Sequence, residues 1–281
     1  MQGMTIPRIA LLSAALFACG FELVDSHFVD AQRSKSINKT FTGPNDSEFP
    51  YPTQEGKMGQ SDPAALAEIN QSVASSLVPE HAGLEVTGTL TSGPGDAQQQ
   101  YPVSFVIDNG RRFRLDIQKP KGTRTLRIDG DKGKAKQGND TIQELEDIEF
   151  VNPLGLPSLL QEIAGRKDAS VVDDGVFVVK DHSMNKVTIT LFRTRFNVPV
   201  SASFYFDSAT HTLEKGVFVE HSLGNRSLKN LMVMTYGGYR KDQSVLLPHE
   251  YSETINGQLL MTLKVTTTAI TPGHDNSYFS F

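Results

Sequence analysis

The residues most able to do acid–base or metal chemistry in this chain are its seven histidines and the carboxylates near them. No two histidines have the spacing of an H-x-H or H-E-x-x-H metal motif. Asp181-His182 and His249-Glu250 each place a carboxylate beside a histidine, but neighbours on a strand point to opposite faces of a sheet. We therefore expect His182 and His249 to be solvated turn or strand-edge residues. We also expect no metal site and no cofactor.

Other kinds of catalysis lack their motifs as well. The chain has no G-x-S-x-G elbow, no P-loop and no G-x-G-x-x-G fingerprint. Its formal net charge of −5 argues against nucleic-acid binding, which needs concentrated Lys and Arg. The sequence thus favours a protein that is not an enzyme. A hydrolase of an unfamiliar kind stays open as an alternative, with His182 and His249 as its best candidates.

The N-terminal residues 1–31 have the order of an export signal. A short start carrying Arg8 precedes an apolar run from Ile9 to Gly20, and Ala31 offers a small residue for cleavage. Cys19, the single cysteine, follows Leu16-Phe17-Ala18 in a pattern that partly resembles a bacterial lipobox. Cys19 is therefore either a lipidation site or part of a removed signal. We expect an exported, periplasmic protein, or a lipoprotein anchored at the outer membrane.

After the signal, composition predicts a flexible polar linker over residues 32–60 and a single domain over 61–281. Asp62-Pro63 is a helix start, since Asp suits the N-cap and Pro the first helical position. Leu66, Ile69, Val73 and Leu77 follow at helical spacing, and we expect Pro79 to end the helix.

From Leu84 onward the pattern is typical of β-structure. Residues 103–107 and 112–117 alternate in polarity and are joined by Asp108-Asn109-Gly110, which predicts a hairpin; Asn256-Gly257 predicts another. Further candidate strands, including 249–255, 259–270 and 277–281, continue to the end. The fold class is therefore mainly β: a curved antiparallel sheet or half-open β-barrel with a few covering helices.

An apolar segment interrupts the strands in the middle of the chain. Residues 141–149 are acidic and helix-compatible, and residues 152–160 combine prolines and a glycine with leucines. Because loops are normally polar, such a segment is either packed into the core or part of a binding mouth, with a lid near 141–165. The candidate ligand-binding residues combine this segment with large apolar residues of the sheet: Leu154, Leu156, Leu159, Leu160, Ile163, Phe105, Phe113, Phe204 and Phe206.

Several of these patterns together carry a resemblance to a known family. They are the hairpin start Leu84 to Thr89, Arg112 to Ile117 with Pro120 and Gly122, the insertion Leu154 to Gly165, and the ending from Leu246 to Phe281. With them, residues 62–281 resemble the bacterial lipoprotein-localisation family, the LolA/LolB-like periplasmic carriers and their relatives. The resemblance implies a half-open β-barrel over an apolar cavity, with helices as a lid and lipoprotein acyl chains as cargo.

Our leading hypothesis is an exported binding protein for lipid or acylated lipoprotein, with peripheral association with the outer membrane. The second is an envelope sensor or scaffold that binds an envelope protein partner through a sheet edge or through the linker. The third is the hydrolase named above.

Overall fold

The computed structural model describes residues 49–79, 81–93, 98–108, 112–129, 132–145, 154, 156–192, 199–222 and 225–280. The predicted export signal 1–31, with Cys19, and the first part of the predicted linker, 32–48, lie outside these residues.

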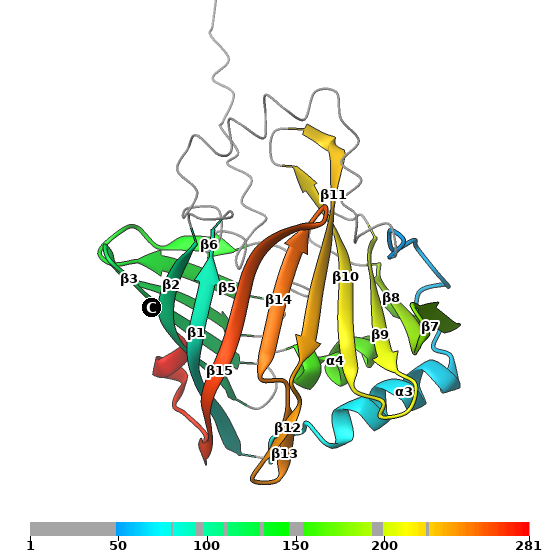
Figure 1. Ribbon diagram of the computed structural model, residues 1–281, viewed down its shortest axis with the longest axis horizontal. Coiled ribbons are helices and arrows are strands. Elements are labelled where there is room, and N and C mark those ends of the chain that lie inside the picture. The colour runs from blue at the N-terminus through cyan, green and yellow to red at the C-terminus, as the bar shows by residue number, and fades with distance from the viewer. Residues whose placement is uncertain are drawn as a thin grey trace, which may run out of the picture.

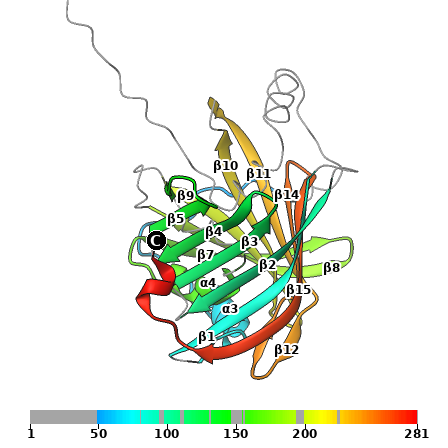
Figure 2. The ribbon, with the colours of Figure 1, turned by 90° about the vertical axis from the view of Figure 1, so that its left-hand side faces the viewer.

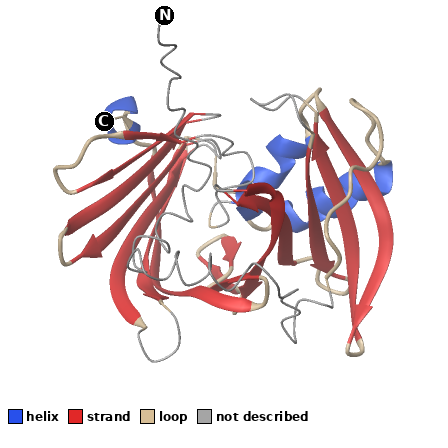
Figure 3. Cartoon of the chain, turned by 90° about the horizontal axis from the view of Figure 1, so that it is seen from above, coloured by secondary structure: helices blue, strands red, loops and turns tan. Residues whose placement is uncertain are grey.

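One antiparallel sheet of thirteen strands organises the domain (Figure 1). Its spatial order is β6-β5-β4-β3-β2-β1-β15-β14-β11-β10-β9-β8-β7, and every pairing is antiparallel. Figure 3 shows from above that the sheet is curved and not closed, with the helices beside one of its halves. The predicted fold class, a curved antiparallel sheet with few helices, is confirmed.

The chain builds this sheet as two meanders. The first contains β1 (Ala82–Ser92), β2 (Gln99–Asp108), β3 (Arg112–Lys119), β4 (Gly122–Asp129), β5 (Lys132–Gln137) and β6 (Gln143–Leu145). The second contains β7 (Ala169–Val179), β8 (His182–Leu191), β9 (Val200–Asp207), β10 (Leu213–Ser222), β11 (Asn225–Gly237), β14 (Glu250–Ile255) and β15 (Gln258–Pro272). A separate hairpin, β12 (Arg240–Asp242) with β13 (Val245–Leu247), interrupts the second meander.

The two meanders join where β1 pairs with β15, near the middle of the sheet (Figures 1 and 2). The pairing runs from Ala82 opposite Pro272 to Ser92 opposite Met261, with a register shift between Thr87 and Gly88. A Cβ atom at Gly88 would lie 2.3 Å from the backbone oxygen of Lys264. The close approach of the two strands at the shift therefore requires a residue without a side chain.

Two helices cover the inner face of the second meander. Helix α3 (Pro63–Ala74) buries Ala65, Ile69 and Val73, and helix α4 (Leu156–Ala164) packs beside it through Leu160 and Ile163. Gln161 in α4 donates a hydrogen bond from Nε2 to Asn70 Oδ1 in α3 at 3.1 Å. The apolar side chains of both helices thus join the core of the sheet.

Helix α3 ends earlier than the sequence predicted. It ends at Ala74, before Pro79, and Leu77 lies exposed after it. The physical reason is a competing contact: the carbonyl of Ser75 accepts a hydrogen bond from the amide of Leu246, and Ser76 Oγ donates to the carbonyl of Leu246. The Ser75 carbonyl, which would accept a hydrogen bond within a further helical turn, is therefore bonded to the β12–β13 hairpin instead.

The predicted hairpins are present. Strands β2 and β3 pair from Val103 opposite Ile117 to Asp108 opposite Arg112. At the β14–β15 turn, Asn256 and Gly257 have φ angles of 48° and 77°, the positive values that a two-residue hairpin turn needs.

Two predictions of local structure were wrong. Residues 143–145, within a segment described as helix-compatible, form the edge strand β6. The expected strand at 277–281 is replaced over Asn276–Phe279 by a 3₁₀ helix, η3. There Tyr278 stacks on His274, and the guanidinium groups of Arg114 and Arg112 lie over the rings of Tyr278 and Phe279. These contacts hold the segment on the outer face of the sheet.

Residues 49–62 lie against the second meander. Gly59 and Asp62 donate backbone hydrogen bonds to the carbonyls of Ala169 and Val171 at the start of β7. The Phe49 ring packs against Tyr205 and Phe177, with ring centroids 5.1 and 5.8 Å away. The described end of the predicted linker is thus in contact with the domain.

No helix among the described residues is long and apolar enough to cross a membrane.

The β1–β15 junction yields a first prediction. Gly88→Ala should lower the free energy of unfolding by about 2 kcal/mol or more, because the new Cβ would collide with the Lys264 backbone. Urea denaturation followed by circular dichroism measures this. The control is Gly237→Ala, whose Cβ would meet no atom within 4 Å, and it should change stability by about 0.5 kcal/mol or less. Equal stability of the two variants would contradict the prediction.

Candidate functional site

Two small apolar cavities lie on the inner face of the sheet, around the β1–β15 junction. Each has a volume of about 10 Å³, room for about one water molecule. The first is lined by Leu84, Val86, Phe105, Ile107, Leu154, Leu247, Pro248, Tyr251, Val265 and Thr268. The second is lined by Leu90, Val103, Leu115, Ile117, Leu154, Met261 and Leu263.

Leu154 is the residue that the two cavities share. Its side chain is buried in the main apolar core, two residues before α4 begins at Leu156. Leu154 therefore borders both cavities. The predicted lid segment thus contributes a buried side chain to the inner face.

The structure places the other predicted binding residues in three ways. Phe105 lines the first cavity, and the Phe113 ring packs against the Phe105 ring, with centroids 5.9 Å apart. Phe204 and Phe206 on β9, and Leu160 and Ile163 on α4, are buried in the same core but line neither of these cavities. Leu156 and Leu159 lie in α4, with side chains outside the described part of the chain.

Most of the lining residues were not singled out from the sequence. They are medium-sized aliphatic residues at alternate positions of β1, β2, β3 and β15, such as Leu84, Val86 and Leu90 on β1. The alternation marks the inner face of each strand. Which part of that face borders a cavity depends on the pairing of β1 with β15, strands from opposite ends of the domain.

The cavity walls have little polar character. Only Tyr251 and Thr268 among the lining residues carry polar side chains. Burial raises the pKa of Tyr251 far above its ordinary value, so its hydroxyl stays protonated and neutral. Such walls offer no nucleophile with an adjacent base, but they suit an apolar group that leaves water.

Two of the buried charged residues of the sheet lie near the second cavity. Arg124 on β4 and Glu253 on β14 alternate with core residues of their strands, Leu126 and Tyr251 respectively. By this alternation both belong to the inner face. Arg124 pairs with Ile117 in the register and Glu253 with Met261, so both flank the second cavity.

A hydrogen-bonded group of Asp242, His249 and Thr268, called the latch below, lies beside the first cavity. Asp242 Oδ2 on β12 contacts His249 Nε2 at 2.7 Å and accepts a hydrogen bond from Thr268 Oγ1 at 2.5 Å. Leu247 and Pro248, between the two partners, line the cavity. The expectation that His249 is solvated was wrong: it is buried, and its carboxylate partner is Asp242, not the adjacent Glu250.

No protein-family model and no curated protein matches the chain, whereas solved structures share its fold. A LolA superfamily protein from Nitrosomonas europaea has a solved structure with a TM-score of 0.57 and 10% identity, covering 77% of this chain and 97% of that one. A Vibrio parahaemolyticus domain designated an outer membrane lipoprotein-sorting protein gives a TM-score of 0.54 at 9% identity, covering 76% and 95%.

A third solved structure shares the architecture. It is a DUF1329 family protein from Desulfovibrio piger, with a TM-score of 0.54 and 6% identity, and the match covers 80% of this chain and 98% of that one. The chain therefore has the LolA-like fold, as the resemblance noted from the sequence implied. At these identities the likeness concerns the fold.

The latch predicts a pH dependence of stability. Burial alone would raise the pKa of Asp242, but hydrogen bonds from Thr268 and His249 outweigh it and hold the pKa below its ordinary value of 3.8. A carboxyl with a depressed folded-state pKa stabilises the fold above its unfolded pKa, and this contribution is lost as the pH falls through the lower, folded value. Asp242→Asn should therefore lose less stability than the wild type as the pH falls below about 5.

Urea denaturation at pH 7, 5, 4 and 3 measures this difference. Asp140→Asn, at an exposed turn, is the control and should follow the wild type. Parallel pH profiles for wild type and Asp242→Asn would show that the latch carboxylate has no such role.

Proposed function

We propose that this protein is an exported, non-enzymatic binding protein that holds lipid or the acyl chains of a lipoprotein on the inner face of its sheet. The observation that carries the proposal is the pair of apolar cavities that share the lining residue Leu154. The LolA-like fold supports it, since two of the similar structures are a LolA superfamily protein and a lipoprotein-sorting domain. The signal-like residues 1–31 support export to the periplasm.

The cavities are too small for an acyl chain while Leu154 stays in place. Moving one leucine side chain from the core into water costs about 1.5–3 kcal/mol. Each methylene of an entering acyl chain contributes about 0.8 kcal/mol on burial, so about two to four methylenes offset that cost. A longer acyl chain has further methylenes to offset the entropy lost on association, whereas a short one does not.

The direct test is native mass spectrometry with lipid extraction, on protein purified from the periplasm without detergent. A stoichiometric lipid or acylated peptide on the protein is the expected result. An apo mass that stays unchanged after incubation with phospholipid and with a palmitoylated peptide would overturn the proposal.

Leu154→Ala should bind a palmitoylated peptide more tightly than the wild type, by roughly tenfold if about 1.4 kcal/mol of the opening cost is removed. The same change should lower the free energy of unfolding by about 2–5 kcal/mol, because it removes buried methyl groups and leaves a void. Isothermal titration calorimetry and urea denaturation measure the two effects.

The control is Leu259→Ala, on β15 but exposed to solvent, which should change neither quantity. If Leu154→Ala does not fold, Leu154→Val makes a smaller change in the same direction. Unchanged or weaker peptide binding by a folded Leu154 variant would contradict displacement of this side chain.

A second candidate function is binding of an envelope protein, and an exposed sheet edge favours it. Strand β7 is the last strand of the sheet, and residues 59–62 contact only its first part. Farther along, Val176 and Val178 are 65% and 62% exposed. An exposed apolar edge strand can pair with an extended segment of another chain, which adds one strand to the sheet.

This second function predicts a partner contact along β7. A photo-crosslinking residue at position 178 should give one discrete adduct in the periplasm, and the adduct should disappear when Val176→Lys is added. A crosslinker at the exposed Leu259 is the control. Identical adducts from both positions, or none from position 178, would remove this candidate.

A further inference from the structure

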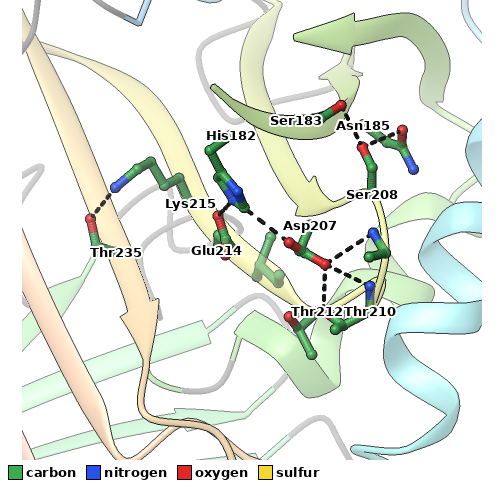
Figure 4. A network of polar contacts seen from close by, with 12 residues as sticks. His182, Ser183, Asn185, Asp207, Ser208, Thr210, Thr212, Glu214, Lys215 and Thr235 are labelled. Atoms are coloured by element: carbon green, nitrogen blue, oxygen red, sulfur yellow. Dashed lines mark hydrogen bonds and ion pairs between the residues drawn. The ribbon is translucent and has the colours of Figure 1, made fainter. Parts of the chain in front are cut away.

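Three side chains with metal-binding atoms converge on the outer face of the sheet, at the ends of β8, β9 and β10 (Figure 4). They are His182, Asp207 and Glu214. His182 Nε2 lies 2.6 Å from Glu214 Oε2 and 3.7 Å from Asp207 Oδ2. The three ligand atoms all lie within 4.8 Å of one another, and no other such group of three occurs in the part of the chain that the structure describes.

These separations are close to those that one metal ion imposes. Zinc binds imidazole nitrogen and carboxylate oxygen at about 2.0–2.2 Å, so its ligand atoms lie about 3–3.5 Å apart. The nitrogen–oxygen distances of 2.6 and 3.7 Å bracket that range, and each needs a shift of only a few tenths of an ångström. Rotation of the exposed His182 and the half-buried Glu214 side chains can supply such shifts.

Asp207 is already oriented as a ligand. Its Oδ1 atom accepts hydrogen bonds from the amides of Ala209 and Thr210, at 3.0 and 2.6 Å, and from Thr210 Oγ1 at 2.8 Å. These bonds fix the carboxylate with Oδ2 toward His182. They also outweigh burial and hold the pKa of Asp207 below its ordinary value, so the group is ionised. Hydrogen bonds to the non-ligating oxygen are how proteins commonly orient a metal-binding carboxylate.

The other two ligands are placed by irregular backbone. Glu214 lies at a register shift, where pairing passes from Leu213 opposite Phe206 to Lys215 opposite Tyr205 and Glu214 has no partner residue. Such a bulge redirects a side chain. His182 follows the tight β7–β8 turn, whose residues Lys180 and Asp181 have φ angles of 48° and 65°.

The nearby charge favours a cation. Lys215, next to Glu214, extends away from the three ligands, and its Nζ atom donates to Thr235 Oγ1 at 3.0 Å (Figure 4). The same Nζ atom lies over the Phe49 ring. Without a metal, the His182–Glu214 contact is an ordinary side-chain hydrogen bond near the surface.

We propose that His182, Asp207 and Glu214 bind a divalent transition metal, zinc by preference, with water completing the coordination. One imidazole with two carboxylates suits zinc, whereas calcium and magnesium prefer oxygen ligands throughout. The ion would join three neighbouring strands on the face of the sheet opposite the cavities. The proposal departs from the expectation of no metal, and it is independent of the proposed lipid binding.

The test is a zinc titration of untagged, chelator-treated full-length protein by isothermal titration calorimetry, with the thermal midpoint measured in parallel. The wild type should bind one zinc ion, and zinc should raise its midpoint. Glu214→Gln and His182→Ala should each weaken binding at least tenfold and abolish the midpoint shift. Asp181→Asn, which removes a neighbouring charge without removing a ligand, is the matched control and should bind as the wild type does.

Two outcomes would overturn the proposal. One is that the wild type shows no saturable binding of zinc, which would leave only the hydrogen bond between His182 and Glu214. The other is equal binding by the wild type, Glu214→Gln and His182→Ala, which would assign the zinc to other histidines. Since all three residues lie away from the cavities, the affinity for a palmitoylated peptide should be unchanged in both variants.

Discussion

The pairing of β1 with β15 is the contact on which the rest of the domain depends. It joins the two meanders, which the chain builds one after the other, into one sheet with a shared inner face. Without it, the inner face of the first meander would lie in water, at a cost of about 25 cal/mol for each Å² of apolar surface. The pairing leaves β6 and β7 as the two outermost strands of the sheet, and residues 59–62 contact the start of β7. The cavities lie around this junction, and Leu154 borders both of them.

Much of the fold could be predicted from the sequence, because local patterns determine it. The Asn256-Gly257 turn and the alternating strands lie where the residues indicate. Three of the errors share one cause, which is a contact with a residue outside the local pattern. Leu246 ends α3, Arg112 and Arg114 hold the C-terminal residues in η3, and Asp242 buries His249. No local pattern contains these partners.

The candidate sites were predictable to different degrees. Leu154 stands out in sequence because it is apolar in a segment rich in prolines and glycine, whereas the aliphatic cavity wall requires the β1–β15 register. The group of His182, Asp207 and Glu214 gives no motif, since the ligands lie on three strands and one of them depends on a β-bulge. Spacing rules such as H-E-x-x-H detect ligands on a single helix, and they miss ligands that adjacent strands bring together.

The two faces of the second meander explain an unusual feature of β9. Ala202 to Phe206 are all buried, and Phe204-Tyr205-Phe206 places large rings on both faces of the strand. A strand with one face in water alternates apolar with polar residues, so three consecutive aromatic residues indicate cover on both sides. The inner cover is α3 with α4, and the outer cover is Phe49 with Phe177, around Tyr205. Composition predicts a linker over residues 32–60, and Phe49, in the described part of it, contributes to this outer layer. Lys215 Nζ lies over the Phe49 ring and donates to Thr235 Oγ1, so this cation is held beside the proposed metal ligand Glu214 by partners of its own.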